Sequence, residues 1–346
     1  MKKLDLIKNG EFKISNTRIP TLKKNTSIVK LSHVGICSSD INRSFNNGAY
    51  DFPLVMGHEA MGYIHKSSIN FKEGDKVVIF PLKPCFICGS CKNSKFQTCN
   101  KYSYYGSREN GAYQEYLRVN NWNIVKLPKR IDDADAALIE PTSVMIHVKN
   151  KLINLAGGPN SLKGMKGAII GGGFLSMVIS KILTEIGIHQ PDIFDRNSFK
   201  IKYASTKNIH MHHSGELLKN IRNEYDWVIE ASGDPNAFLK SIQIAKPNAK
   251  LIWMSNINNQ LSIETEIFSQ ILRKELIISG SWNSSFKPTG KSDWQETIDM
   301  MRKGFSPSEF ITHYVELNEV PGILSRLYDH KQRVKQFNSI KAMIRF

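Results

Sequence analysis

The sequence of 346 residues contains no long hydrophobic run, no low-complexity tract and no internal repeat. Its most apolar stretch, residues 168–183, is too short to span a bilayer and includes three glycines, two serines and a lysine. The first residues are basic, but the apolar segment of a signal peptide does not follow them. We therefore expect a cytoplasmic protein with no membrane partner.

Acidic residues are scarce relative to basic ones, since 31 Asp and Glu stand against 47 Lys and Arg, a net charge of +16. This balance is typical of proteins that bind nucleic acid, membrane surfaces or acidic small molecules, but also of a lysine-rich surface with no ligand. The lysines form no dense block, so we expect no nucleic-acid partner. Cysteines are few as well. Five is an odd number, which in a reducing compartment favours metal or catalytic chemistry over disulfides.

The pattern of apolar and polar residues in the sequence changes near residue 148. Up to residue 147, β-branched and aromatic segments such as Ser27–Leu31 and Lys76–Phe80 are bounded by Gly, Asn, Asp or Pro, which predicts a β-rich domain. Over residues 148–283, apolar strands alternate with helical patterns, which predicts a doubly wound parallel sheet. Residues 284–346 return to the mixed texture. The sequence thus predicts an α/β domain inserted into a β-rich one.

Four cysteines lie close together at residues 85–99. They are Cys85, Cys88, Cys91 and Cys99, with the spacing C-x2-C-x2-C-x7-C. Four thiolates at this spacing can surround one tetrahedral zinc ion, which gives a closed, structural site. An iron–sulfur cluster is the main alternative, but the last cysteine is too distant for the bacterial ferredoxin pattern. We predict a zinc loop that stabilises the fold and takes no part in catalysis.

The fifth cysteine, Cys37, is followed by His58 and Glu59 in a Gly-His-Glu triplet and much later by Glu140. Thiolate, imidazole and carboxylate are all zinc ligands, and an open site with three protein ligands is the catalytic arrangement. Each residue also has a simpler interpretation. Cys37 would serve as a small buried hydrophobe, His58 as a core histidine and Glu140 as a helix N-terminal carboxylate. Their joint occurrence upstream of a dinucleotide motif favours the zinc site.

A glycine-rich turn follows the predicted strand 166–170 and opens a predicted helix. The turn reads Gly171, Gly172, Gly173, Phe174, Leu175 and Ser176. Serine replaces the third glycine of the G-x-G-x-x-G pattern, at a position where a small residue is needed for helix–strand packing. Asp195 ends the next predicted strand, where an acidic side chain binds the ribose 2′-hydroxyl and repels a 2′-phosphate. The pattern predicts NAD rather than NADP, although the neighbouring Arg196 is able to accommodate the phosphate.

Together these features resemble the zinc-dependent medium-chain alcohol dehydrogenase family. The matching segments are GICSSD at 35–40, GHE at 57–59, the four-cysteine loop, Glu140-Pro141, the glycine turn and EASG at 230–233. Glu140 stands where other members carry a second cysteine, so the resemblance is strongest to the polyol dehydrogenase branch. The segments FNNGAYDFPLVMGHE (45–59) and KYSYYGSRENGAYQEY (101–116) resemble members that act on phosphorylated polyols.

The resemblance implies a GroES-like β-rich catalytic domain with an inserted Rossmann domain, and an active site between the two. It implies two zinc ions per chain, one in the loop 85–99 and one catalytic. The catalytic zinc is held by Cys37 and His58 with Glu59 and Glu140 as further ligands, unless one glutamate acts through the zinc-bound water. Members of the family are dimers or tetramers, so we expect a homodimer or homotetramer.

Further roles follow from the resemblance. Ser39 begins a proton relay, or is a turn serine, and Asp40 orients His58. Arg43 holds a substrate phosphate, or forms a surface salt bridge. Trp282 walls the substrate pocket, or is packed in the core. Lys341 reaches the coenzyme pyrophosphate, or is a solvated lysine.

The expected activity is hydride transfer between a secondary alcohol of a polyol or polyol phosphate and NAD(H), with zinc lowering the pKa of the alcohol. One alternative is a ketose-phosphate reductase that works in the biosynthetic direction, for instance for a surface polysaccharide. Another is an L-threonine or diol dehydrogenase of the same family. A third is a non-catalytic zinc protein that binds nucleic acid through its basic surface, which predicts salt-dependent DNA binding and one zinc per chain.

Overall fold

The structure is a computed structural model that describes residues 1–69, 71–216, 221–257 and 260–346. The chain folds as two compact units. The first comprises residues 1–143 and 284–346, and the second residues 144–283. The predicted α/β insertion begins at residue 148, whereas the second unit begins at Val144. Helix α4 (Ile139–Leu155) carries the chain from the first unit into the second.

The first unit is built mainly of strands, as the residues before 148 predict. Its strands are β1 (Lys2–Lys8), β2 (Glu11–Asn16), β3 (Thr26–Ile36), β4 (Leu54–Val55), β5 (Glu59–Ser67), β6 (Lys76–Ile79), β7 (Leu82–Lys83), β8 (Ser103–Tyr104), β9 (Tyr116–Asn120), β10 (Ile124–Lys126), β17 (Ile311–Val315) and β18 (Lys341–Arg345). Its helices are α1 (Ser38–Asn42), η1 (Arg43–Asn47), α2 (Gly89–Lys92), η2 (Phe96–Thr98), η3 (Asn121–Asn123), α3 (Asp133–Ala137), α11 (Asp293–Arg302), η4 (Pro307–Phe310), η5 (Leu317–Glu319) and α12 (Val320–Lys331).

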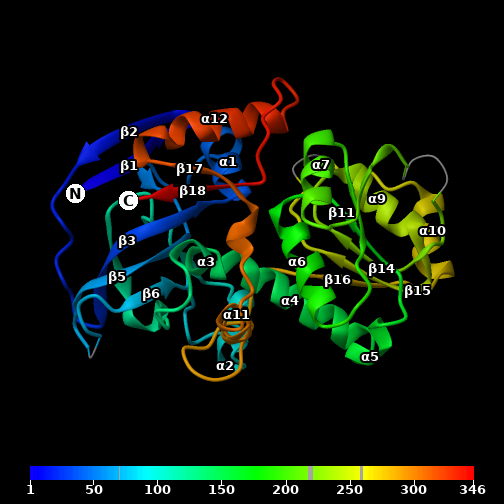
Figure 1. Cartoon of the computed structure of the whole chain (residues 1–346), viewed down its shortest axis with the longest axis horizontal. Coiled ribbons are helices and arrows are strands. Elements are labelled where there is room, and N and C mark those ends of the chain that lie inside the picture. The colour runs from blue at the N-terminus through cyan, green and yellow to red at the C-terminus, as the bar shows by residue number, and fades with distance from the viewer. Residues whose placement is uncertain (70, 217–220, 258–259) are drawn as a thin grey trace. The chain divides into compact units, whose positions relative to one another are not determined.

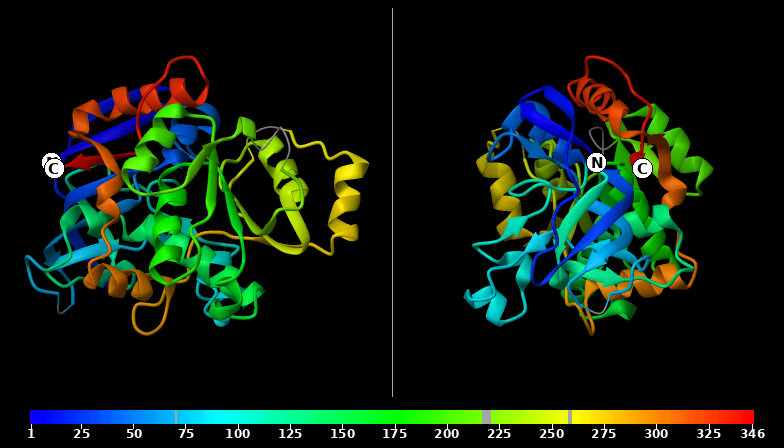
Figure 2. Two further views of the ribbon diagram at one scale, coloured as in Figure 1. Left: turned by 45° about the vertical axis from the view of Figure 1, so that its right-hand side comes forward. Right: turned by 90° about the vertical axis from the view of Figure 1, so that its left-hand side faces the viewer.

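Strand β3 organises the larger sheet of this unit. The sheet runs in the order β10-β6-β5-β3-β18-β17, with β9 also paired to β3. The C-terminal strand β18 therefore lies among the N-terminal strands, as its red arrow beside the blue strands shows (Figures 1 and 2). The β-branched inward-facing residues of β3, β5 and β6 are buried in one apolar core. This sheet holds the ends of β3 and β5 side by side.

The second unit is a six-stranded parallel sheet in the order β13-β12-β11-β14-β15-β16. Its strands are β11 (Gly167–Ile170), β12 (Asp192–Asp195), β13 (Met211–His213), β14 (Tyr225–Glu230), β15 (Ala245–Trp253) and β16 (Ile277–Gly280). Its other helices are α5 (Pro159–Leu162), α6 (Phe174–Glu185), α7 (Ser198–Thr206), α9 (Pro235–Ile244) and α10 (Thr265–Arg273). Apolar strands that alternate with amphipathic helices produce this sheet, as predicted. The order changes direction beside β11, which places the β11–α6 turn at the switch point of the sheet.

The predicted fold class, a β-rich domain with an inserted Rossmann-type sheet, is confirmed. Among the described residues, no helix is both long enough and apolar enough to cross a membrane.

Candidate active site

Cys37 lies at the junction of β3 and the short helix α1, where it is the N-cap residue. Its Sγ accepts a hydrogen bond from the Ser39 amide at 3.5 Å, and its own amide donates to Asp40 Oδ2 at 3.2 Å. This reciprocal pattern is a capping box, which fixes the direction in which the chain leaves the strand. The sequence Cys-Ser-Ser-Asp therefore holds the thiol in place at the end of β3.

His58 and Glu59 are brought to the same place by β5, which pairs with β3 so that Glu59 lies opposite Gly35. A Cβ atom at residue 35 would lie 1.9 Å from Glu59 Oε2, so a larger residue there would displace the Glu59 carboxylate. One potential ligand atom from each of Cys37, His58 and Glu59 lies within 4.8 Å of the others. We refer to these three residues as the catalytic cluster.

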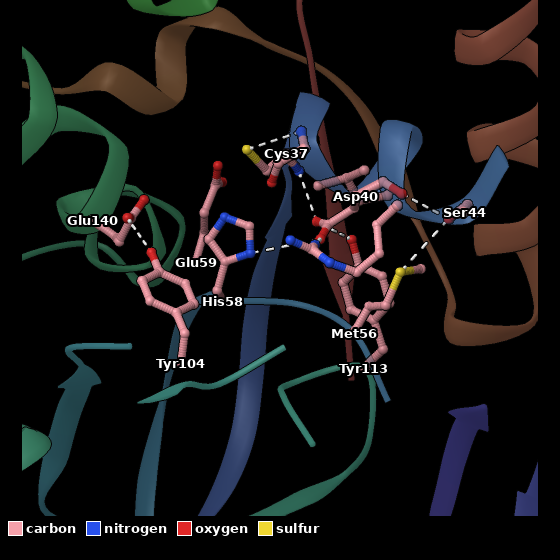
Figure 3. Close-up of polar contacts among 12 residues, drawn as sticks. Cys37, Asp40, Ser44, Met56, His58, Glu59, Tyr104, Tyr113 and Glu140 are labelled. Atoms are coloured by element: carbon pink, nitrogen blue, oxygen red, sulfur yellow. Dashed lines mark hydrogen bonds and ion pairs between the residues drawn. The ribbon is translucent and has the colours of Figure 1, made fainter. Parts of the chain in front are cut away.

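Asp40 fixes the orientation and the charge of His58. Its carboxylate is fully buried and accepts hydrogen bonds from the Tyr113 hydroxyl at 2.9 Å and from Arg43 Nη1 at 3.1 Å. His58 Nδ1 lies 3.6 Å from Asp40 Oδ1, so the other ring nitrogen, Nε2, is the one available to a ligand (Figure 3). Burial lowers the pKa of His58, but the charges of Asp40 and Cys37 outweigh burial and raise this pKa well above its usual range.

Glu59 forms an ion pair with a buried lysine. Lys341, the first residue of β18, is buried and places Nζ 2.7 Å from Glu59 Oε1 and 2.5 Å from Oε2, while donating also to the Ile36 carbonyl at 3.1 Å. The alternative of a solvated Lys341 is therefore wrong. Within the first unit, Lys341 contacts the carboxylate of Glu59, a member of the catalytic cluster, and neutralises its charge.

Glu140 lies in the first turn of α4, outside the 4.8 Å group but close to it. Its carboxylate accepts a hydrogen bond from the Tyr104 hydroxyl at 3.2 Å, and the ring of Tyr104 meets His58 edge-on (Figure 3). Burial raises the pKa of Glu140 to about 7, and the nearby charge of His58 opposes this shift. Glu140 thus supplies a buried carboxyl group beside the catalytic cluster.

The predicted substrate residues have different surroundings. The guanidinium of Arg43 forms a salt bridge to the fully buried Asp40, so it is not part of a surface pair. Trp282, in the second unit, is 48% exposed, which excludes the alternative of a core position. Ser39 is half-buried and contributes its amide to Cys37. The substrate contacts of Arg43 and Trp282 and the proton relay through Ser39 remain predictions.

The four cysteines of the loop 85–99 form a second group of ligand atoms within 4.8 Å of one another. The Cys85 amide donates to Cys99 Sγ at 3.3 Å. A hydrogen bond from the Cys91 amide lowers the pKa of Cys88 to about 6, whereas burial raises the pKa of Cys91 to about 12. Four cysteine sulfurs at this separation could surround one cation as thiolates, and the donor set is that of structural zinc.

Aromatic packing holds the four-cysteine loop 85–99 against the rest of the first unit. Trp122 meets Phe86 at 4.9 Å and Phe96 at 5.2 Å between ring centroids. Trp122 also meets Phe286, which is stacked on Phe80 at 4.0 Å. The loop is therefore continuous with a buried aromatic cluster, and its conformation is linked to the stability of this unit.

The glycine turn of the second unit matches an anion-binding helix start. Gly171 has a φ of +104°, and a Cβ there would lie 2.9 Å from the Ser232 amide nitrogen. A Cβ at Gly173 would meet no protein atom within 4 Å, so nothing in the protein requires glycine there. Gly173 is the N-cap of α6 and provides no side-chain cap. The open space and the uncapped amides fit the approach of a phosphate to this helix end.

Asp195 lies at the end of β12, beside this turn. Its carboxylate accepts hydrogen bonds from the amides of Gly172 at 2.7 Å and Asn197 at 2.8 Å, and from Lys200 Nζ at 3.1 Å. Burial raises the pKa of Asp195, but the charge of Lys200 and these hydrogen bonds lower it below its usual value. Arg196 is exposed next to it. The carboxylate is therefore ionised at the position expected for recognition of the coenzyme ribose.

Sequence reasoning missed two tyrosines of the site, Tyr104 and Tyr113. Both lie in the segment 101–116, whose resemblance to polyol phosphate dehydrogenases pointed to the region but not to their contacts. Burial and the nearby carboxylates raise the pKa of both hydroxyl groups well above their usual range. Both side chains therefore act as hydrogen-bond donors, Tyr104 to Glu140 and Tyr113 to Asp40.

Several known proteins resemble this chain in sequence and structure. Residues 23–129 match the alcohol dehydrogenase GroES-like domain. Galactitol 1-phosphate 5-dehydrogenase from Escherichia coli K12 is 29% identical over 299 residues, covering 83% of this chain and 84% of that protein. The crystal structure of galactitol-1-phosphate dehydrogenase from Escherichia coli matches with a TM-score of 0.86 at 27% identity and covers 100% of both chains. L-threonine 3-dehydrogenase from Shewanella baltica is 23% identical over 87% of this chain and 88% of that protein.

The domain match and the full-length agreement with a solved dehydrogenase show that the chain has the fold of the medium-chain dehydrogenases. In sequence and structure the chain resembles the zinc-dependent alcohol dehydrogenases, and its resemblance to a polyol phosphate dehydrogenase among them is confirmed. The protein is accordingly an oxidoreductase.

Proposed function

We propose that this protein is a zinc- and NAD-dependent dehydrogenase that transfers a hydride between a secondary alcohol of a polyol phosphate and NAD, reversibly. The observation that carries the proposal is the catalytic cluster, in which a thiol, an imidazole and a carboxylate from β3 and β5 converge within 4.8 Å. The similarity to galactitol 1-phosphate 5-dehydrogenase supports the substrate class.

The residues of the first unit fit two zinc ions per chain. Cys85, Cys88, Cys91 and Cys99 would hold the structural ion. Cys37 and His58, with Glu59 and Glu140 as further carboxylates, would hold the catalytic ion. The buried carboxylate of Asp40 beside the cluster would favour a bound cation, which His58 would bind as the neutral imidazole. When bound there, zinc lowers the pKa of an alcohol and so favours loss of its proton.

The surrounding side chains have distinct tasks in this proposal. Asp40 keeps the Nδ1 side of His58 toward itself and leaves Nε2 for the ion, and Tyr113 fixes Asp40 in turn. Lys341 neutralises Glu59, and Tyr104 orients Glu140. Ser39 is proposed to pass the alcohol proton toward solvent.

For the coenzyme, we propose NAD(H) bound at the β11–α6 turn. Gly171 allows the close approach of the turn to Ser232, and Gly173 leaves the backbone accessible. The first turn of α6, which begins with Phe174 and Leu175, would receive the pyrophosphate. Asp195 would accept a hydrogen bond from the ribose 2′-hydroxyl. When bound, the nicotinamide accepts or donates the hydride.

Asp195 is predicted to set the choice of coenzyme. In Asp195→Asn the amide oxygen still accepts from the Gly172 amide, but the negative charge that repels a 2′-phosphate is lost, and Arg196 and Lys200 remain nearby. A hydrogen bond to a charged group contributes about 1.5–3 kcal/mol, so kcat/KM with NAD should fall about 10- to 100-fold relative to kcat/KM with NADP. Steady-state kinetics with both coenzymes measures this ratio. The same substitution at exposed Asp51 is the control, and an unchanged NAD/NADP ratio in Asp195→Asn would contradict the assignment.

The substrate class is tested by kinetics on pairs of alditols and alditol phosphates, with the corresponding ketoses and NADH for the reverse direction. We expect kcat/KM to be at least about 10-fold higher for the phosphorylated member of a pair, because a charge-assisted contact to phosphate adds about 1.5–3 kcal/mol. Arg43 and Trp282 are proposed substrate contacts. L-threonine is included because of the similarity to L-threonine 3-dehydrogenase. Equal turnover of free and phosphorylated alditols, or a preference for L-threonine, would show that the proposed substrate class is wrong.

We also propose that the chain forms a homodimer or homotetramer. The support is the edge strand β16 of the parallel sheet, where Ile277 is exposed, together with the exposed apolar side chains Phe268 and Leu272 of α10. An unpaired strand edge with apolar side chains next to it is a template for association with a second chain.

A further inference from the structure

One lysine near the catalytic cluster has no anionic partner in the described part of the chain. Lys331 is the last residue of α12 and is half-buried. Its Nζ donates to Asn42 Oδ1 at 2.9 Å, across 289 residues of sequence. No described carboxylate oxygen lies within 4.0 Å of this ammonium group. Partial burial with only an amide as partner leaves the charge of Lys331 uncompensated.

The other basic groups next to the cluster differ from Lys331 in this respect. Lys341 is neutralised by Glu59, and Arg43 by the buried Asp40. Each of these two cations pairs with a buried carboxylate. Breaking either pair would leave a buried carboxylate unpaired, which has a large cost in free energy. Of these three cations, Lys331 is the one without a protein counter-ion.

Lys331 lies close to the reacting centre. Asn42 ends helix α1, and α1 begins directly after Cys37. Helices α1 and α12 pack against each other, as their neighbouring positions in Figure 1 indicate. Burial lowers the pKa of Lys331. The contact with Asn42 places the ammonium group at the end of the short helix that begins next to Cys37.

We propose that Lys331, positioned by Asn42, binds a phosphoryl group beside the catalytic cluster. The inference rests on the proposed dehydrogenase function and specifies how an anionic ligand is recognised. An ammonium group that lacks a protein anion gains a counter-ion when phosphate enters, and the contact is a charge-assisted hydrogen bond. The phosphoryl group comes either from a polyol phosphate substrate or from the coenzyme.

The test compares Lys331→Met, Lys331→Arg and the matched control Lys335→Met, which removes the same charge from an exposed position four residues on. Two readouts are used with the zinc-loaded protein. The first is kcat/KM for an alditol phosphate, the free alditol and NAD. The second is the Tm with and without inorganic phosphate, which does not depend on turnover. Wild type and Lys335→Met should gain Tm on addition of phosphate, Lys331→Met should not, and Lys331→Arg should recover most of the gain.

The kinetic measurements on the three variants identify the source of the phosphoryl group. If Lys331→Met lowers kcat/KM for the alditol phosphate about 10- to 100-fold more than for the free alditol, Lys331 binds the substrate phosphate. If it raises the KM for NAD with either alditol, Lys331 binds the coenzyme pyrophosphate. A Tm gain with phosphate equal to that of wild type, together with equal kinetic effects on both alditols and an unchanged KM for NAD, would overturn the proposal. If wild type shows no preference for phosphorylated alditols, the proposed substrate class fails instead, and the phosphate-dependent Tm and the KM for NAD still decide the role of Lys331.

Discussion

Cys37→Ser should lose nearly all dehydrogenase activity while the protein stays folded. A serine hydroxyl is a poor zinc ligand compared with a thiolate, so the catalytic ion would be released and its stabilisation of the alkoxide lost. That stabilisation amounts to several kcal/mol, and kcat/KM should therefore fall by at least about 1,000-fold. Serine preserves the N-cap of α1, because its oxygen accepts from the same amides as Cys37 Sγ. The Tm should change little.

The measurement combines steady-state kinetics with metal analysis and thermal unfolding. Zinc content should fall from two ions to one per chain, in line with the two ligand groups among the described residues. Ser38→Ala, which changes the exposed neighbouring residue, is the control and should retain both ions and full activity. Full activity in Cys37→Ser would show that the catalytic cluster is misassigned. A wild-type protein with one zinc per chain would instead favour the alternative of a non-catalytic zinc protein.

The catalytic cluster could be predicted from sequence because its parts are set by local rules. The capping box of Cys37 and Asp40 spans four residues, and His58 and Glu59 are adjacent in the chain. Only the pairing of β3 with β5 had to be supplied by the fold, because the residues between the two strands, 37–58, include α1, η1 and β4. The glycine turn of the second unit was equally local, since a strand, a turn and a helix follow one another directly.

The neighbours that control the charge of the cluster could not be predicted, because they arrive from distant segments. Lys341 reaches Glu59 only because β18 inserts beside β3 in a register that pairs Ala342 with Ile36. Tyr104 reaches Glu140 because β8 and the start of α4 meet in space. Side-chain periodicity in a strand gives the face of a residue but not the identity of its partner.

The salt bridge of Arg43 is an intermediate case. Asp40 and Arg43 are three residues apart, a spacing at which side chains meet on a helix. That spacing is visible in the sequence, but the sequence does not show that a helix covers these residues. The resemblance to polyol phosphate enzymes therefore suggested a ligand phosphate as the partner of Arg43. The structure shows instead that the guanidinium balances a buried carboxylate. Any phosphate contact of Arg43 must therefore use N–H groups that Asp40 leaves available.

The zinc loop gives the largest expected effect on stability. Cys91 is buried and contributes one of four thiolates, so Cys91→Ser should release the structural ion and leave three thiolates without their cation. Binding of a structural zinc ion contributes directly to the free energy of folding. The loop contacts a buried aromatic cluster through Phe86, Phe96 and Trp122. Loss of the ion should therefore destabilise this cluster as well as the loop.

We expect Cys91→Ser to lose about 4 kcal/mol of folding free energy, which corresponds to a Tm lower by about 10 °C for a unit of this size. Differential scanning calorimetry and zinc analysis measure the two effects, and Ile87→Ser, at an exposed position of the same loop, is the control because it keeps all four ligands. The absorption spectrum of the wild-type protein separates zinc from an iron–sulfur cluster, since zinc is colourless and a cluster absorbs in the visible range. A Cys91→Ser protein that retains both ions and the wild-type Tm would show that the four cysteines do not form a metal site. The two cysteine substitutions should therefore differ in their effects. Cys37→Ser should remove activity while the protein stays stable, whereas Cys91→Ser should first lower the stability.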